Sequence, residues 1–370
     1  MRAPFVTSHE PFVANGCRSR QIVRLARGRW LAFRVLGNRD ATTGMQRSVL
    51  SFAAVAAVIV CASGVARAGS MQPRVFAPGE ISSAAGVDCA TFMPDGKTVF
   101  FHQQPWSIGM IMVSHKTGGH WSTPEIASFS GIWNDHDPAL APDGSFMVLP
   151  SNRPDAPGGA PVHGGHLWRV NRTADGWSAP IRLPDTVNFG TYIFAPSIAA
   201  NGDLYFQSRD NPSHQFHLYR SAWRDGQYQK SVRLDLMADS IHELDPAIAP
   251  DQSFIVFDAG KDGSDQPDHL YIAFREGNGW SRAIDLGDAI DAYQPWGSHL
   301  GPDGTTLYFT GSHTTETSWP RTRAEAERDL VRARAWDNGV DHIYSVSLKP
   351  WLEAHRNGDP ELPSRSGVSS

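Results

Sequence analysis

The sequence predicts an all-β fold, a five-bladed β-propeller in which every blade is a four-stranded antiparallel sheet. Three observations predict it. A turn motif recurs five times, an apolar strand pattern surrounds each copy, and an N-terminal segment resembles the strand that the last unit lacks. Repeats of about fifty residues built from short strands are typical of propellers.

The recurring turn motif centres on Pro-Asp-Gly. It reads Ala-Pro-Asp-Gly around Pro142, and successive copies are separated by 48, 58, 50 and 52 residues. The other copies, two of them altered, lie at Pro94, Ala200, Pro250 and Pro302. Pro fixes φ, Asp bonds the backbone and Gly accepts a positive φ, so each copy predicts a hairpin turn.

Each turn is flanked by predicted strands. Before it, segments such as Asp137-Pro-Ala-Leu-Ala suit a first strand that is buried on both faces. After it, apolar runs such as Phe254-Ile-Val-Phe form a second strand, and segments such as Leu270-Tyr-Ile form a third. A fourth begins after a glycine turn, as in Trp121-Ser-Thr-Pro, and its proline places it at a sheet edge.

The fifth unit has no fourth strand after Leu348. Its counterpart lies near the other end of the sequence, where Val75-Phe-Ala-Pro-Gly-Glu-Ile resembles Trp121-Ser-Thr-Pro-Glu-Ile. We therefore predict that the N-terminal strand completes the last blade. This pairing closes the ring and removes a free sheet edge.

With these motifs the sequence resembles the TolB-type propeller repeats, bacterial relatives of the WD repeats. The matching pieces are Asp-Pro-Ala-x-Ala-Pro-Asp-Gly, the Ser151-Asn-Arg153 that follows a second strand, and the His-Leu-Tyr or His-Leu-Trp of the third strand. The resemblance covers about residues 75–348 and implies the propeller fold. The chain is expected to depart from TolB in two ways: no separate N-terminal α/β domain is predicted, and five blades are predicted instead of six. The resemblance therefore implies no role in the Tol envelope machinery.

The segments outside the repeats predict export. Residues 45–68 have the basic, apolar and Ala-x-Ala parts of a signal peptide, with cleavage after Ala68. Residues 1–44 are interpreted as a start assigned too far upstream or as a cytoplasmic extension. The propeller is assigned to 69–350, with a helical insertion at 319–336 that begins with Pro320 in its first turn, and 351–370 are assigned to a C-terminal tail. A periplasmic or secreted protein without stable membrane insertion is expected.

Charge limits the partners. Residues 69–370 carry 36 acidic and 23 basic side chains. This excess of negative charge would repel the phosphates of nucleic acid, so nucleic acid is an unfavourable partner. The expected partners are a small polar molecule, a glycan or a peptide segment, and a protein partner remains an alternative.

Residues that precede the first strands should converge at one mouth of the propeller axis, although they lie about fifty positions apart. Arginines that follow the second strands are expected to line the outer side of this mouth. The ligand-binding candidates are Asp88, Asp135, His136, Arg153, Tyr192, Arg209, His242, Glu243, Trp296 and His299.

Three interpretations of this set stay open. In the first, the polar residues are structural, and Asp137 and Asp245 bond backbone groups near their own turns. In the second, His136, His242 and His299 are ligands of a divalent metal, although no cofactor is firmly indicated. In the third, Tyr192 and Trp296 are flat apolar walls around a small polar ligand.

We expect a ligand- or partner-binding module that acts through the axial mouth. The alternative is a carbohydrate-active enzyme, a glycoside hydrolase or polysaccharide lyase, with or without a metal. Its catalytic candidates are Glu243, His136 and Asp88. Neither a Gly-x-Ser-x-Gly motif nor a phosphate-binding loop occurs in the sequence.

Overall fold

The computed structural model describes residues 72–105, 107–190, 192–209, 214–261, 268–315 and 317–359. All of them belong to one compact unit, Ala68–Ser370. The predicted signal peptide and the segment before it lie outside the described residues. Among the described residues, the helices are too short or too polar to span a bilayer.

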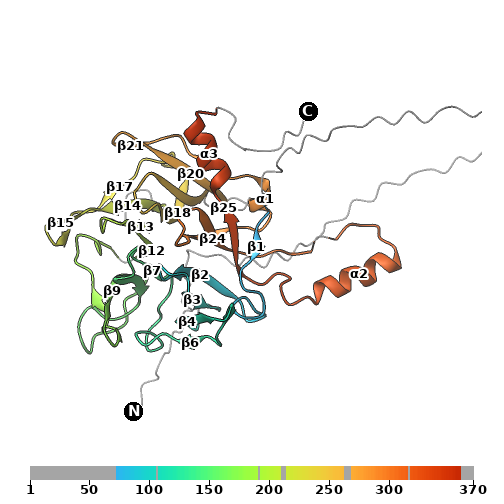
Figure 1. Ribbon diagram of the computed structural model, residues 1–370, viewed down its shortest axis with the longest axis horizontal. Coiled ribbons are helices and arrows are strands. Elements are labelled where there is room, and N and C mark those ends of the chain that lie inside the picture. Colours follow the sequence, from blue (N-terminus) through green and yellow to red (C-terminus); the bar gives the residue numbers. More distant parts are fainter. Residues whose placement is uncertain are drawn as a thin grey trace, which may run out of the picture. The chain divides into compact units, whose positions relative to one another are not determined.

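The described strands form five antiparallel blades, as predicted (Figure 1). The first strands are β2 (Val87–Phe92), β7 (Ala139–Leu140), β12 (Ile193–Ile198), β18 (His242–Ile248) and β23 (Trp296–Leu300). The second strands are β3 (Thr98–Gln103), β8 (Phe146–Ser151), β13 (Leu204–Ser208), β19 (Phe254–Gly260) and β24 (Thr306–Gly311). The third strands are β4 (Met110–Thr117), β9 (His166–Thr173), β14 (His217–Ser221), β20 (His269–Glu276) and β25 (His342–Ser347).

In the first four blades the outer strands begin later than predicted. The outer strands of all five blades are β6 (Glu125–Ile126), β11 (Ile181–Arg182), β17 (Val232–Arg233), β22 (Ile284–Asp285) and β1 (Arg74–Val75). The residues that were expected to begin these strands lie instead in short two-residue strands of small hairpins. These strands are β5 (His120–Trp121), β10 (Gly176–Trp177), β15 (Trp223–Arg224) with β16 (Gln227–Tyr228), and β21 (Gly279–Trp280). Pro124 and Pro180 fall in the gaps between ladder and outer strand, because proline has no N–H to donate.

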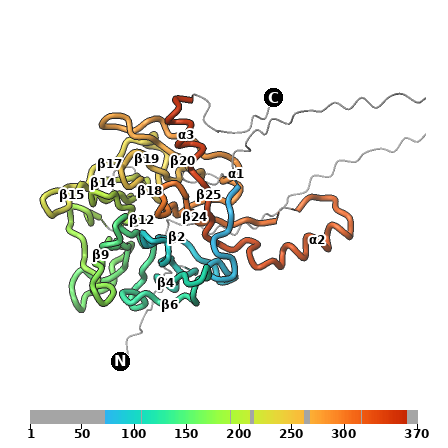
Figure 2. The backbone as a smooth tube through the Cα atoms, in the orientation of Figure 1, coloured from blue at the N-terminus to red at the C-terminus, as the bar shows by residue number. Residues whose placement is uncertain are grey.

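The N-terminal strand closes the last blade, as predicted. In β1, Val75 pairs with Tyr344 of β25, and the Phe76 N–H donates to the Ile343 carbonyl at 2.8 Å. Figure 2 shows this blue segment beside the red one. The Phe76 ring packs edge-on against Phe92 of the first blade and Tyr308 of the fifth, at 5.3 and 5.4 Å.

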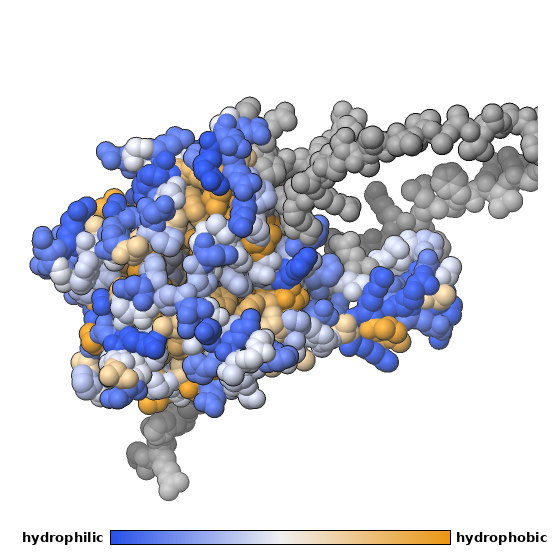
Figure 3. All heavy atoms as spheres, viewed as in Figure 1, coloured by the Kyte–Doolittle hydropathy of each residue, from blue (hydrophilic) through white to orange (hydrophobic). Residues whose placement is uncertain are grey.

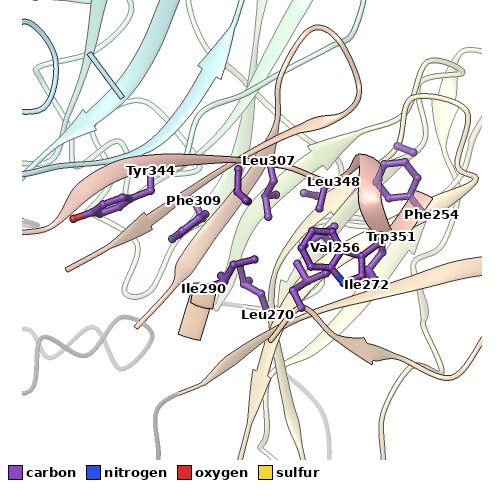
Figure 4. Packing of buried hydrophobic residues seen from close by; sticks show 14 of the residues in the cluster. Phe254, Val256, Leu270, Ile272, Ile290, Leu307, Phe309, Tyr344, Leu348 and Trp351 are labelled. Atoms are coloured by element: carbon purple, nitrogen blue, oxygen red, sulfur yellow. The ribbon is translucent and has the colours of Figure 1, made fainter. Parts of the chain in front are cut away.

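Five hydrophobic clusters fill the five gaps between neighbouring blades. The cluster between the fifth and first blades includes Ile343, Val87 and Phe101. The cluster between the fourth and fifth blades includes Val256, Leu270, Leu307 and Phe309 (Figure 4). Because every gap is filled, burial stabilises the ring as a whole. The face in Figure 3 is mostly hydrophilic, with scattered hydrophobic residues.

Three helices are described. The helix expected within 319–336 is α2 (Arg323–Ala333), between β24 and β25; none of its residues is buried, and Figure 2 shows it apart from the sheets. Its N-cap is Thr322, in a capping box with Glu325, so the expectation of Pro320 in the first turn was wrong.

The remaining two helices were not predicted. Helix α3 (Lys349–Asn357) occupies the start of the expected tail, and its Trp351 is fully buried against the fourth and fifth blades (Figure 4). That apolar contact makes α3 part of the packed domain. The short α1 (Asp288–Asp291) connects β22 to β23.

Candidate functional site at the propeller axis

The five first strands share one unusual backbone conformation. The residue five positions before the first residue of Pro-Asp-Gly, or of its counterpart, has a positive φ in every blade. These residues are Cys89 (49°), Asp137 (41°), Ala195 (47°), Asp245 (46°) and Gly297 (63°). In four of the five blades the strand register shifts at this point. Such bulges re-aim side chains, and here they do so around the axis.

Hydrogen bonds at this level join one blade to the next. The N–H of Cys89 donates to Thr310 Oγ1 at 3.0 Å, and the N–H of Asp245 donates to Gln207 Oε1 at 2.7 Å. The N–H of Gly297 donates to Asp245 Oδ2 at 2.8 Å. The expectation that Asp245 bonds backbone near its own turn was therefore wrong; its carboxylate reaches the following blade.

Two acidic clusters are buried at the axis. In the first, ligand atoms of Asp88, Cys89 and Asp137 lie within 4.8 Å of one another. Asp88 accepts a hydrogen bond from His102 Nδ1 at 3.0 Å, and Asp137 Oδ2 accepts one from His136 Nδ1 at 3.1 Å. The other oxygen of Asp137 has no hydrogen-bond partner.

The second cluster is the pair Asp245 and Asp258, two buried carboxyl groups of which Asp245 raises the pKa of Asp258. Oδ1 of Asp258 has no hydrogen-bond partner. Asp258 was missed by the sequence analysis, although a signal exists. In four second strands a polar residue follows a phenylalanine at this register, and these residues are His102, Gln207, Asp258 and Thr310.

The pKa values of the carboxyl groups in these two clusters are shifted in opposite directions. Burial and the nearby Asp137 raise the pKa of Asp245 to about 7. Burial and Asp245 raise the pKa of Asp258 well above its ordinary range. Burial alone would raise the pKa of Asp137 as well, but the adjacent His136, through its charge and its hydrogen bond, lowers it on balance. Asp137 therefore ionises at a lower pH than Asp245 and Asp258 do.

The histidines at the axis also differ. Burial lowers the pKa of His299 to about 4, although Asp137 opposes this, so His299 is neutral near pH 7. Burial opposes protonation of His102, but Asp88 raises its pKa on balance. Asp137 and Asp245 remain 5% and 7% exposed, so the cluster still reaches solvent.

Half-buried aromatic side chains form the rim. Phe194 lies 5.5 Å from His136 and 6.3 Å from Tyr192, measured between ring centroids. The Arg209 guanidinium lies over the Tyr192 ring at 3.6 Å. Trp296 pairs with Thr310 at the start of the first strand of the fifth blade, immediately before Gly297. His242, at the start of β18, lies 2.9 Å from Asp268.

Three predicted site residues lie away from the axis. Glu243 is fully buried against the preceding blade, where it accepts from His217 Nδ1 at 3.3 Å. Burial raises the pKa of Glu243 to about 7. Asp135 is held by Arg153 and by the Ser130 hydroxyl, the latter at 2.8 Å. Their side chains fill positions between blades, which removes Glu243, Asp135 and Arg153 from the mouth.

The histidine ligand set is not assembled either. Among the described residues, two groups could hold a metal: Asp88 with Cys89 and Asp137, and His269 with Asp285 and Asp291. His136, His242 and His299 belong to neither group. Two surface hollows of about 420 and 400 Å³ lie at the outer edge of the first blade and between the turns at Pro94 and Pro302. No predicted site residue lines them.

The chain is similar to several solved propeller structures. It is 18% identical to a protein assigned as TolB from Agrobacterium tumefaciens, with a TM-score of 0.41, covering 64% of this chain and 73% of that one. It is 13% identical to TolB from Acinetobacter baumannii (TM-score 0.43), covering 70% of this chain and about half, 54%, of that one. It is 11% identical to an α-L-arabinofuranosidase from Lactobacillus brevis (TM-score 0.48), covering 72% and 90% of the two chains.

These likenesses concern the fold alone. No protein-family model matches the chain, and no curated protein matches it. The five blades and their closure by β1 are established by the strand pairing itself.

Proposed function

We propose that this protein is an exported binding module whose axial mouth takes a small polar ligand through a cationic group, such as an amine. The observation that carries the proposal is the buried acidic set Asp88, Asp137, Asp245 and Asp258, in which two carboxyl oxygens have no hydrogen-bond partner. A buried polar atom without a partner costs about 1–3 kcal/mol. A bound cationic group would supply the missing donors and charge.

The rim supports an organic cation. Aromatic faces attract cations, and Tyr192, Phe194 and Trp296 are only half-buried at the mouth. Arg209, which stacks on Tyr192, would meet a carboxylate or another anionic part of the same ligand. A zwitterion or the amino end of a peptide segment fits both features.

Calorimetric titration with spermidine and lysine amide tests the proposal, with choline, a cation that has no N–H to donate, and with Ca²⁺ and Mg²⁺ as comparisons. We expect an amine to bind, and Asp137→Asn and Trp296→Ala each to weaken it at least tenfold. Asp155→Asn, which alters an acid on the second blade, should leave the affinity unchanged. If no amine binds, or if both axial variants bind like the wild type, the proposal fails.

A hydrolase acting on a glycosidic bond is the second candidate, and one observation favours it. Asp137 and Asp245 are neighbouring carboxyl groups with pKa values shifted in opposite directions, the arrangement that an acid and a base need. Asp245 would be the acid in this reaction, in place of Glu243, one of the three catalytic candidates predicted from the sequence. Release of nitrophenol from p-nitrophenyl glycosides, abolished in both Asp137→Asn and Asp245→Asn, would support a hydrolase over a simple binding module.

A further inference from the structure

A second group of ligating side chains lies on the fourth blade, away from the axial set. His269 begins β20, Asp285 ends β22, and Asp291 ends α1. His269 Nδ1 is 3.1 Å from Asp285 Oδ2 and 2.9 Å from Asp291 Oδ2. The side chains are 26%, 20% and 9% exposed, so water reaches one side of the group.

The group lacks positive charge. Two carboxylates face one imidazole nitrogen, which has at most one hydrogen to donate. Neither oxygen of Asp291 receives a well-formed hydrogen bond, although this side chain is nine-tenths buried. Asp268, the preceding acid, is directed to His242 instead. Something that binds several oxygens at once would complete the arrangement.

The second blade shows the same framework in a satisfied form. His166 corresponds to His269, and Arg182, which pairs with Trp168, corresponds to Asp285, which pairs with Tyr271. Six residues further on, Asn188 corresponds to Asp291. In the second blade, Arg182 Nε and His166 Nδ1 both meet Asp155, at 2.6 and 2.7 Å.

The third blade also keeps a basic residue at this register. Arg233 pairs with Tyr219 and forms an ion pair with Asp239, six residues later, at 2.7 Å. At these two positions the fourth blade has Asp285 and Asp291, whereas the second blade has Arg182 and Asn188. The third blade also has an acid at the second position, but its Arg233 forms an ion pair with that acid. The fourth blade therefore lacks a positive charge at the position that Arg182 and Arg233 occupy in the second and third blades.

We propose that His269, Asp285 and Asp291 bind a divalent transition ion, Zn²⁺ or Mn²⁺. One imidazole nitrogen and two carboxylate oxygens suit these ions. Ligand atoms at metal bonds of about 2.0–2.2 Å lie roughly 3–3.5 Å apart, close to the separations seen here. The exposed side leaves room for water as a further ligand.

The ion would link three elements. It joins β20, β22 and α1, and α1 leads through Tyr293 to Trp296 at the rim of the mouth. The Tyr293 ring packs on Tyr344 at 4.6 Å. Binding would therefore stabilise the connection between the fourth and fifth blades.

The test is metal stoichiometry after incubation with Zn²⁺ or Mn²⁺ and dialysis, with calorimetric affinities. We expect one equivalent in the wild type. Asp285→Arg, which restores the arrangement of the second blade, should weaken binding at least 100-fold, and Asp291→Asn, which copies Asn188, at least tenfold. Circular dichroism establishes that each variant is folded. Asp291→Asn keeps the test valid if Asp285→Arg does not fold.

Two controls locate the ion. Asp155→Asn, at the matched acid of the second blade, and Asp137→Asn, at the axis, should both retain the full equivalent. A wild type that binds neither ion at millimolar concentration would overturn the proposal. So would folded Asp285→Arg and Asp291→Asn variants that bind like the wild type, or an equivalent lost only in Asp137→Asn.

Discussion

At the scale of single residues, the axis depends on one left-handed backbone position per blade. Gly297 occupies this position in the fifth blade, with φ of 63°. A Cβ there would lie 2.9 Å from Cys89 Sγ and 3.1 Å from Thr310 Oγ1. Glycine adopts this conformation without the cost that a Cβ brings, and at Gly297 it is also needed for the close approach of the first blade.

Gly297→Ala should therefore destabilise the protein more than a glycine substitution that changes conformation alone. Gly304 is the matched control, since its φ is 65° and a Cβ there meets nothing within 4 Å. We expect about 1 kcal/mol for Gly304→Ala and a further 1–3 kcal/mol, roughly, for Gly297→Ala from overpacking. Denaturant unfolding measures both. Equal losses would contradict the close packing of Gly297 against Cys89.

The sequence predicts part of this site. Asp88, His136 and His299 could be predicted as axial residues, because each lies a few residues before its Pro-Asp-Gly turn and the repeat places such residues near the axis in every blade. It cannot place Glu243, because the bulge in β18 shifts the alternation of side chains. Nor does it show that Asp135 is held by Arg153 and Ser130. Asp258 lies on a second strand and becomes an axial residue only through pairing with the first.

At the scale of elements, α3 is the largest departure from prediction. Trp351 is fully buried, and the His355 ring stacks on Phe274 with centroids 3.7 Å apart. A helix at the end of a repeat array is hard to predict from sequence, because its apolar face is recognisable only beside the blades that it covers. Proline positions, by contrast, predicted the edges of the sheets correctly.

Trp351→Ala should lower the free energy of unfolding by about 3–5 kcal/mol, the usual cost of removing a buried aromatic side chain. Leu330→Ala on α2 is the control, since Leu330 is 50% exposed; it should change stability by less than about 0.5 kcal/mol. Thermal and denaturant unfolding supply the comparison. Similar small effects from both would mean that α3 does not stabilise the domain.

At the scale of the whole molecule, closure of the ring joins the first and fifth blades. This feature was predicted, because the likeness between the segment at Val75 and that at Trp121 does not depend on bulges or packing. Phe76 contacts both blades across the closure.

Phe76→Ala should cost roughly 2–3 kcal/mol, less than full burial would because this side chain is half-buried. Val232→Ala, on the outer strand of the third blade and 67% exposed, is the control and should change stability little. Hydrogen exchange should also speed up at β25 in Phe76→Ala. An unchanged β25 would contradict closure through β1.

The closed ring brings the acids of separate blades to one axis, and proton release on binding tests that claim most directly. The pKa of Asp245 is raised to about 7 and that of Asp258 well above its ordinary range, so Asp245 is mostly protonated at pH 6. A cationic group that binds there favours the ionised form and expels the proton. Calorimetry of the best-bound amine at pH 6, in buffers of different ionisation enthalpy, should show about one proton released by the wild type and much less by Asp245→Asn. Equal proton release by the two proteins, or none from the wild type, would contradict a cation site at the axis.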